Sequence, residues 1–283
     1  MTQDASQNPE DPEAGRKAFI RQTFDTVCAE YGRGNLRFFE KAAAGLPELL
    51  QLRGDEQLLD VATGTGLAST LLAAQLSRGH VTGIDLSDGM LQQASERARA
   101  MGLSNIDFRQ MDMTRMDLPE DAFDIINCSF GVFFVEDLNG LMRHIVTRLK
   151  PGGRLLTTHF AQGSMSPMQE LIMQRLKDYG VDVPQAAWSQ LDSEAANRDL
   201  YEAAGLSNIH HQRRQVGYYF DSAEGWWDVV WWAGFRGFVN QIDEDRIEQF
   251  KREHLQEVES LRDDKGIFFN VEVIHTLGER PLS

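Results

Sequence analysis

The fold is decided by the stretch Leu58-Leu59-Asp60-Val61-Ala62-Thr63-Gly64-Thr65-Gly66-Leu67. It opens as a short apolar run with one acidic residue, which predicts a buried strand, and residues 67–76 predict a helix. Two glycines join the two elements. Because Gly64 and Gly66 have no Cβ, a ligand can approach the main chain closely at a helix start, where backbone N–H groups are free. The stretch therefore predicts a ligand-binding turn between a strand and a helix.

The next predicted strand ends in an acidic residue, Asp85, which lies 21 positions after Gly64. In dinucleotide-binding folds an acid about 20 residues beyond the glycine turn accepts hydrogen bonds from ribose hydroxyls. Asp85 therefore predicts a ligand with an adenosine-like ribose. The alternative interpretation is that Asp85 only caps the following helix, together with Ser87 or Asp88.

The glycine spacing separates two classes of ligand. A nicotinamide or flavin site favours G-x-G-x-x-G, with a helix start aimed at a pyrophosphate. Here Gly66 is followed by Leu67-Ala68-Ser69-Thr70, so the third glycine is missing. Asp60 would repel a pyrophosphate and attract an ammonium group. The pattern therefore favours an adenosyl ligand without phosphates and disfavours a nicotinamide dehydrogenase.

Four segments carry a resemblance to a known family: residues 58–66, 83–91, 117–126 and 149–155. Together they resemble the core of class I S-adenosylmethionine-dependent methyltransferases, in the ubiquinone/menaquinone-biosynthesis type and its small-molecule relatives. Ala62 stands where the wider superfamily often has glycine. The resemblance implies an α/β, Rossmann-like fold: a seven-stranded, mostly parallel sheet with helices on both faces, a final antiparallel strand, and an N-terminal plus inserted helical cap. It also implies S-adenosylmethionine as cofactor and S-adenosylhomocysteine as product.

The resemblance implies roles for single residues. Asp60 is expected at the methionine end of the cofactor, Asp85 at the ribose, and Asp112 with the main chain of Met113 at the adenine. Asp112 is alternatively a turn cap, and Tyr31 either covers the methionine end or only packs the cap. The full set of expected cofactor-binding residues is Tyr31, Asp60, Ala62, Gly64, Gly66, Asp85, Leu86, Met90, Asp112, Met113 and Ser129.

The acceptor site is expected where the strand of residues 123–128 ends, because ligands of open α/β sheets bind at the carboxyl ends of strands. Ser129, Phe130 and Phe133 should therefore lie near the reacting methyl group. His159, near the end of a later strand, is the candidate general base, since a neutral imidazole can take a proton at neutral pH. Its alternative role is a structural or substrate-orienting hydrogen bond.

Four of the five tryptophans occur between residues 226 and 232. On a helix Trp227 and Trp231 share one face. Three interpretations stay open: an aromatic face buried against the core, a lid that contacts a flat or apolar acceptor through Trp227 and Trp231, and a membrane-interface belt. Few basic residues lie nearby, which weakens the last.

The charge and cysteine content restrict the partners. The net charge is −15 and the pI about 4.9, so bulk electrostatics oppose nucleic-acid binding. Cys28 and Cys128 lie far apart and make no metal-ligand pattern, which predicts a reduced, cytoplasmic protein without a metal. The polar start and the lack of an apolar run near ~20 residues predict no signal peptide and no stable membrane insertion.

The predicted function is methyl transfer from S-adenosylmethionine to an O, N or C atom of a small molecule, with an aromatic or apolar acceptor favoured and a homodimer left open. The alternative is a non-catalytic adenosyl-binding regulator or subunit. The predicted organisation is a disordered tail (1–15), an N-terminal helical cap (16–57), the cofactor-binding core (58–160), an inserted cap over the acceptor (161–200), and a segment that completes the sheet and carries the aromatic lid (201–283).

Overall fold

The computed structural model describes residues 12–183 and 187–282. Its main feature is a seven-stranded sheet with the strand order β3-β2-β1-β4-β5-β9-β6. Strands β3, β2, β1, β4 and β5 are parallel, and β9 pairs antiparallel with both β5 and β6. The predicted α/β fold is thus confirmed. The strands are β1 Gln57–Val61, β2 His80–Asp85, β3 Ile106–Gln110, β4 Phe123–Ser129, β5 Leu149–Phe160, β6 Ser207–Gln215 and β9 Glu272–Glu279.

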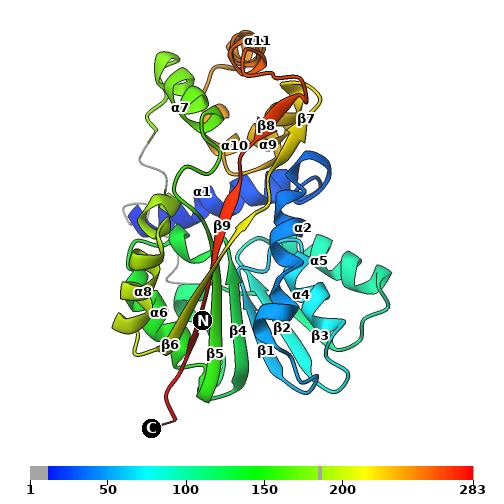
Figure 1. The fold of residues 1–283 in the computed structure, drawn as a ribbon, viewed down its shortest axis with the longest axis vertical. Helices are drawn as coiled ribbons and strands as arrows, with labels where there is room; N and C mark the ends of the chain where they lie inside the picture. The colour runs from blue at the N-terminus through cyan, green and yellow to red at the C-terminus, as the bar shows by residue number, and fades with distance from the viewer. Residues whose placement is uncertain (1–11, 184–186, 283) are drawn as a thin grey trace, which may run out of the picture.

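Helices cover both faces of the sheet, as Figure 1 shows. α4 (Leu67–Ala73) and α5 (Asp88–Ala100) lie on one side, and α6 (Leu138–Val146) and α8 (Glu194–Ala203) on the other. Successive residues of the central strands therefore alternate between two apolar layers. Leu58 belongs to one buried cluster and Leu59 to the other, and both are fully buried. This is why the sequences of the central strands are nearly continuous apolar runs.

Two chain segments are each divided between two sheets. The strand β6 ends at Gln215, and the strand β9 begins at Glu272. Beyond these points the chain forms a separate two-stranded sheet from β7 (Tyr218–Phe220) and β8 (Ile267–Phe269). The two chain segments stay side by side after they leave the main sheet, since the Val216 N–H donates to the Val271 carbonyl at 2.8 Å.

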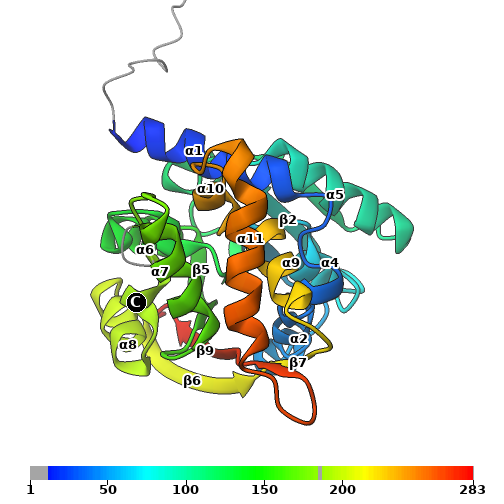
Figure 2. The ribbon, with the colours of Figure 1, turned by 90° about the horizontal axis from the view of Figure 1, so that it is seen from above.

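A lobe stands above the carboxyl ends of the parallel strands (Figure 1). It contains β7 and β8 with α7 (Met168–Asp178), α9 (Glu224–Trp232), α10 (Arg236–Val239) and α11 (Glu244–Glu259). Helix α1 (Pro12–Val27) crosses between this lobe and the sheet, and it packs beside α10 (Figures 1 and 2). The short helices α2 (Phe38–Ala43) and α3 (Leu46–Leu50) complete the N-terminal cap.

The domain prediction needs two corrections. Helix α1 begins at Pro12, so residues 12–15 do not belong to a disordered tail, while residues 1–11 lie outside the described chain. The inserted cap of residues 161–200 also divides. Its helix α7 belongs to the lobe, but α8 packs on the sheet, where the Tyr201 hydroxyl donates to the Thr276 carbonyl at 2.8 Å. Across the described residues, no helix combines the length and the apolar character that a bilayer crossing requires.

Candidate functional site

Two cavities lie under α1, at the carboxyl ends of the parallel strands. The first, here called the polar cavity, has a volume of about 140 Å³ and is lined by the ends of β1, β2 and β4. The second, here called the aromatic cavity, has a volume of about 290 Å³ and lies between α1, α7, α9 and α10. The two cavities share six lining residues: Ile20, Phe24, Tyr31, Phe39, Phe130 and Phe134. The two cavities are therefore direct neighbours.

Asp60 lies at the floor of the polar cavity and is almost fully buried. Its carboxylate accepts hydrogen bonds from the Thr63 hydroxyl at 2.8 Å, from Asn127 Nδ2 at 2.6 Å, and from the Ser69 hydroxyl. Burial raises the pKa of this carboxyl, and the three hydrogen bonds oppose that effect. A fixed acidic group thus faces a small cavity, which suits a cationic ligand atom.

Asp85 stands at the end of β2 and organises the glycine turn. It accepts from the Gly64 N–H at 2.8 Å and from the Ser87 N–H at 2.9 Å. Burial raises the pKa of the Asp85 carboxyl, and the nearby charge of Asp60 adds to this effect. Gly64 has a φ of +55°, and a Cβ built there would meet nothing within 4 Å. The predicted open approach to the main chain at Gly64 is therefore present.

Gly66 has a different role from the one predicted. It does not line either cavity. Its φ of +74° starts α4 in the left-handed region, and a Cβ there would lie 2.9 Å from the Cβ of Ala94. Glycine is therefore needed at residue 66 for the backbone turn and for packing against α5, and not for contact with a ligand.

Asp112 and Met113, which were predicted to contact the adenine, line the polar cavity together with Leu86 and Met90. The Asp112 carboxylate accepts from the Thr114 N–H at 2.8 Å and pairs with Lys17 Nζ at 2.8 Å. Burial disfavours the charged form, but the hydrogen bonds from Lys17 and Thr114 outweigh it and lower the pKa of this carboxyl. Asp112 therefore caps the turn and lines the cavity, and its hydrogen bond to an adenine stays a prediction.

The residues that line both cavities, here called the shared wall, include Tyr31, Phe39 and Phe130. Tyr31 contacts Phe39 with ring centroids 4.7 Å apart, and burial raises the pKa of its hydroxyl. Phe130 lines both cavities with a φ of +58°. A left-handed phenylalanine is uncommon, and such strain often occurs at functional sites. Ala62, with a φ of +54°, and Ser129 line the polar cavity nearby.

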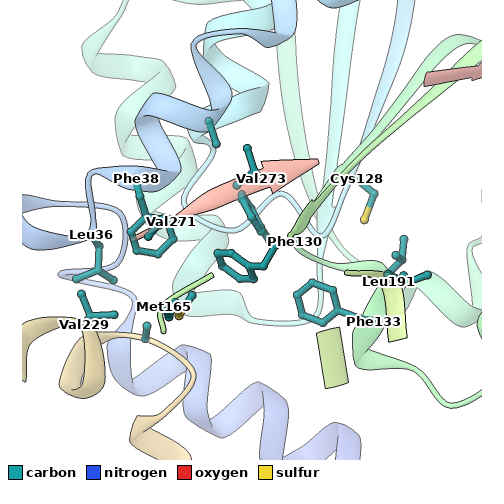
Figure 3. Close-up of a cluster of buried hydrophobic side chains, with 14 of the residues drawn as sticks. Leu36, Phe38, Cys128, Phe130, Phe133, Met165, Leu191, Val229, Val271 and Val273 are labelled. Atoms are coloured by element: carbon teal, nitrogen blue, oxygen red, sulfur yellow. The ribbon is translucent and has the colours of Figure 1, made fainter. Parts of the chain in front are cut away.

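The aromatic cavity is lined mainly by rings. Phe133 lines it, as predicted for an acceptor residue, and Figure 3 shows Phe130, Phe133 and Met165 in the same buried cluster. Further walls come from Phe19 on α1, Trp188 in the loop region before α8, and Phe238 on α10. Sequence reasoning did not find these three residues, because nothing in the chain marks segments so far apart as neighbours.

The prediction that His159 faces the acceptor is wrong. Its neighbour Thr158 points toward the cavity side, with its hydroxyl 3.3 Å from that of Ser129, so alternation along β5 directs His159 to the opposite face. The imidazole is fully buried behind Phe133 and lines neither cavity. Its Nε2 lies 2.9 Å from the Thr157 hydroxyl. Burial, together with His275, lowers the pKa of His159 to about 3. His159 therefore fits the alternative role of a structural hydrogen bond.

The predicted lid contacts of Trp227 and Trp231 are also wrong. These rings stack on each other with centroids 5.5 Å apart, and neither lines a cavity. Trp227 packs toward Phe250 of α11, and the Arg236 guanidinium covers Trp231. The segment still contributes to the aromatic cavity, but through the other face of α9 and the residues that follow it: Val229, Ala233, Gly234 and Phe235.

Lys17 and Thr65 are among the residues of the polar cavity that the sequence analysis missed. Lys17 reaches it from α1 and pairs with Asp112. The Thr65 hydroxyl is buried in the cavity wall and has no hydrogen-bond partner among residues 12–183 and 187–282. Thr65 could have been found, because it lies between the two glycines of the turn. Lys17 could not, since its helix joins the site only through tertiary packing.

Comparison with known proteins adds independent information. Residues 58–153 match a family described as a methyltransferase domain. Aklanonic acid methyltransferase DauC of Streptomyces sp. is 31% identical over 143 residues, which are 50% of this chain and 65% of the relative. The ubiquinone/menaquinone biosynthesis C-methyltransferase UbiE of Desulfotalea psychrophila is 26% identical over 225 residues, 70% of this chain and 86% of the relative.

Residues 58–153 of the chain are therefore similar to the methyltransferase domains of class I S-adenosylmethionine-dependent methyltransferases. A solved structure of Haemonchus contortus phosphoethanolamine N-methyltransferase 2, with S-adenosylhomocysteine bound, has the same fold, with a TM-score of 0.59 at 16% identity over 94% of this chain and 60% of that chain. The part of the chain that matches the family contains Asp60, Gly64, Asp85 and Asp112. The chain spans less than two thirds of the length of most of the curated relatives it matches.

Proposed function

We propose that this protein transfers the methyl group of S-adenosylmethionine to a small, largely apolar aromatic molecule. The observation that carries the proposal is the wall that the polar and the aromatic cavities share. Tyr31, Phe39 and Phe130 line both cavities, so a ligand in one and a ligand in the other contact the same side chains.

The residues of the polar cavity fit S-adenosylmethionine. Asp60 suits the cationic methionine end, Asp85 the ribose hydroxyls, and Asp112 and Met113 the adenine. The open Cβ position at Gly64 and the unpartnered Thr65 hydroxyl leave room and hydrogen-bonding capacity for a ligand among the described residues. The carboxylates of Asp60 and Asp85 both line this cavity and would repel a pyrophosphate, which argues against the nicotinamide alternative.

The bound cofactor supplies a methyl group that its sulfonium already activates. The protein's residues then have two tasks: they hold the acceptor in line with that methyl group, and they keep water out. The rings of Phe39, Phe130 and Phe134 line both cavities, where they can position the acceptor and exclude water. No histidine of residues 12–183 and 187–282 lines either cavity, so positioning should outweigh general-base catalysis. This favours a carbon atom or an already nucleophilic oxygen as the acceptor.

The test is turnover with S-adenosylmethionine labelled in the methyl group. Purified protein is incubated with a panel of hydroxylated aromatic compounds and a matched panel of aliphatic alcohols and amines, and labelled products are counted. We expect transfer to members of the aromatic panel. Cofactor binding without transfer to any compound would instead favour the non-catalytic adenosyl-binding alternative, and transfer only to the aliphatic panel would contradict the aromatic assignment. The cytoplasmic location and the homodimer stay predictions.

A further inference from the structure

One polar atom of the aromatic cavity lacks a partner that its burial would require. Gln169, in the first turn of α7, lines this cavity. Its side-chain oxygen Oε1 is buried, and it accepts no hydrogen bond from residues 12–183 and 187–282. A buried acceptor without a donor costs about 1–3 kcal/mol, so such atoms are rare unless a ligand or water satisfies them.

The position of Gln169 is well fixed. Its N–H donates to the Met165 carbonyl at 2.9 Å, and the Met165 N–H donates to the Asn270 carbonyl at 2.6 Å. Met173 follows one helical turn later on the same face of α7, and both methionines line the same cavity. The Gln169 amide is therefore the polar group between two methionines on the part of the wall that α7 and its preceding residues form. Backbone hydrogen bonds hold this part of the chain in place.

The other polar groups of this cavity are donors, or both donors and acceptors. Arg16 Nε also has no hydrogen-bond partner among the described residues, but it lies 3.7 Å from the Glu136 carboxylate, which balances its charge. The hydroxyls of Thr23 and Tyr31 can donate as well as accept. Among the side chains of residues 12–183 and 187–282 that line this cavity, only Gln169 has a buried oxygen that accepts no hydrogen bond.

We propose that Gln169 determines acceptor specificity by accepting a hydrogen bond from a hydroxyl group on the aromatic acceptor. This inference rests on the proposed function and names the substrate class within it. An apolar ring system fills the cavity, and a hydroxyl attached to it escapes the desolvation cost only where it finds an acceptor. An analogue that lacks the hydroxyl leaves Oε1 unpaired and should bind more weakly.

The test compares two probes of nearly equal shape, 2-naphthol and naphthalene. Calorimetric titration into the protein saturated with S-adenosylhomocysteine gives a dissociation constant for each. We expect wild type to prefer 2-naphthol by roughly tenfold. In Gln169→Met, which keeps the length of the side chain, this preference should vanish. In Gln169→Glu, which keeps an accepting oxygen, it should persist.

Two variants control the experiment. Gln174→Met makes the same exchange on the same helix, at an exposed residue that pairs with Asp178, and it should leave the preference unchanged. Tyr31→Phe tests the competing hydroxyl. The inference is overturned if Tyr31→Phe, and not Gln169→Met, abolishes the preference, or if wild type binds both probes equally or binds neither. Failure of S-adenosylhomocysteine to bind would instead contradict the proposed function itself.

Discussion

The polar and the aromatic cavities adjoin, but they are built in different ways. The polar cavity is made by strand ends and by the turns that follow them, with fixed hydrogen bonds such as that between Gly64 and Asp85. The aromatic cavity is lined by side chains from the lobe, from α1 and α2, and from the chain at the ends of β4 and β5, and its polar groups are few. The first is therefore shaped by backbone geometry, and the second by the choice of side chains.

This difference leads to an expectation about mutations. A change in the polar cavity should disturb hydrogen bonds that hold the backbone as well as the ligand. A change in the aromatic cavity should alter the volume that is available and leave the backbone in place. The two cavities should thus be separable by experiment, although they share a wall.

The largest effect is expected from Asp85→Ala, which tests whether the polar cavity binds the cofactor. The variant removes the acceptor for ribose hydroxyls and for two backbone N–H groups, so the affinity for S-adenosylmethionine should fall about 100-fold, or ~3 kcal/mol. Calorimetric titration measures this. Asp88→Ala, an exposed carboxylate three residues further on, is the matched control and should bind normally. Equal affinities in both variants would contradict the site.

Next in size is Ala233→Leu, which narrows the aromatic cavity. Ala233 is buried in its wall, so three added carbon atoms should lower the affinity for 2-naphthol by about tenfold through steric exclusion. The affinity for S-adenosylhomocysteine should change less than twofold. Ala100→Leu at the exposed end of α5 controls for the added bulk. A parallel loss of both affinities would show that the cavities are not separable.

A smaller effect is expected from Asp60→Asn, which keeps most hydrogen-bonding capacity but removes a buried charge. Because burial raises the pKa of Asp60 above its ordinary value of 3.8, the folded state holds this proton more tightly than the unfolded state. The charge therefore lowers stability at neutral pH, and the variant should be about 1 kcal/mol more stable at pH 7.

The sign can be checked by chemical denaturation at several pH values. The gain in stability should shrink as the pH falls through the raised pKa of Asp60, and it should be small below pH ~4. The same variant should bind S-adenosylmethionine about fivefold more weakly, since the cationic ligand loses a counter-charge. A variant that is less stable than wild type at pH 7 would show that the hydrogen bonds of Asp60 outweigh its desolvation.

The smallest effect is expected from His159→Gln. The imidazole lies outside both cavities, and its pKa of about 3 keeps it neutral near pH 7. The pH profile of kcat/KM for the best acceptor should therefore match that of wild type, with rates within about twofold for the folded fraction. If the variant's pH profile lacked one ionisation that the wild-type profile shows, His159 would act as a general base and this prediction would be wrong.

The polar cavity was largely predictable from sequence, because local sequence patterns determine its main residues. Asp60, Gly64 and Asp85 are set by strand ends and one turn, whose patterns are local. Gly66 was the exception, because its contact is Ala94 on another helix. The aromatic cavity depends on tertiary packing: helical periodicity correctly placed Trp227 and Trp231 on one face, but it could not decide which face meets the cavity.

His159 shows the same limit within a single strand. Its place near the strand end was right, but one residue of register reverses the direction of a side chain. The register followed from pairing with β4 and β9, which bring Thr158 beside Ser129 and His275. Sequence alone did not reveal it.

The shared wall has an evolutionary consequence. Substitutions at Tyr31 or Phe130 affect the surroundings of both ligands at once, so few of them can change the acceptor without harm to cofactor binding. Met165, Gln169 and Met173 line only the aromatic cavity. If the aromatic cavity binds the acceptor as proposed, single substitutions at these three positions can change the acceptor while the residues of the polar cavity are inherited unchanged.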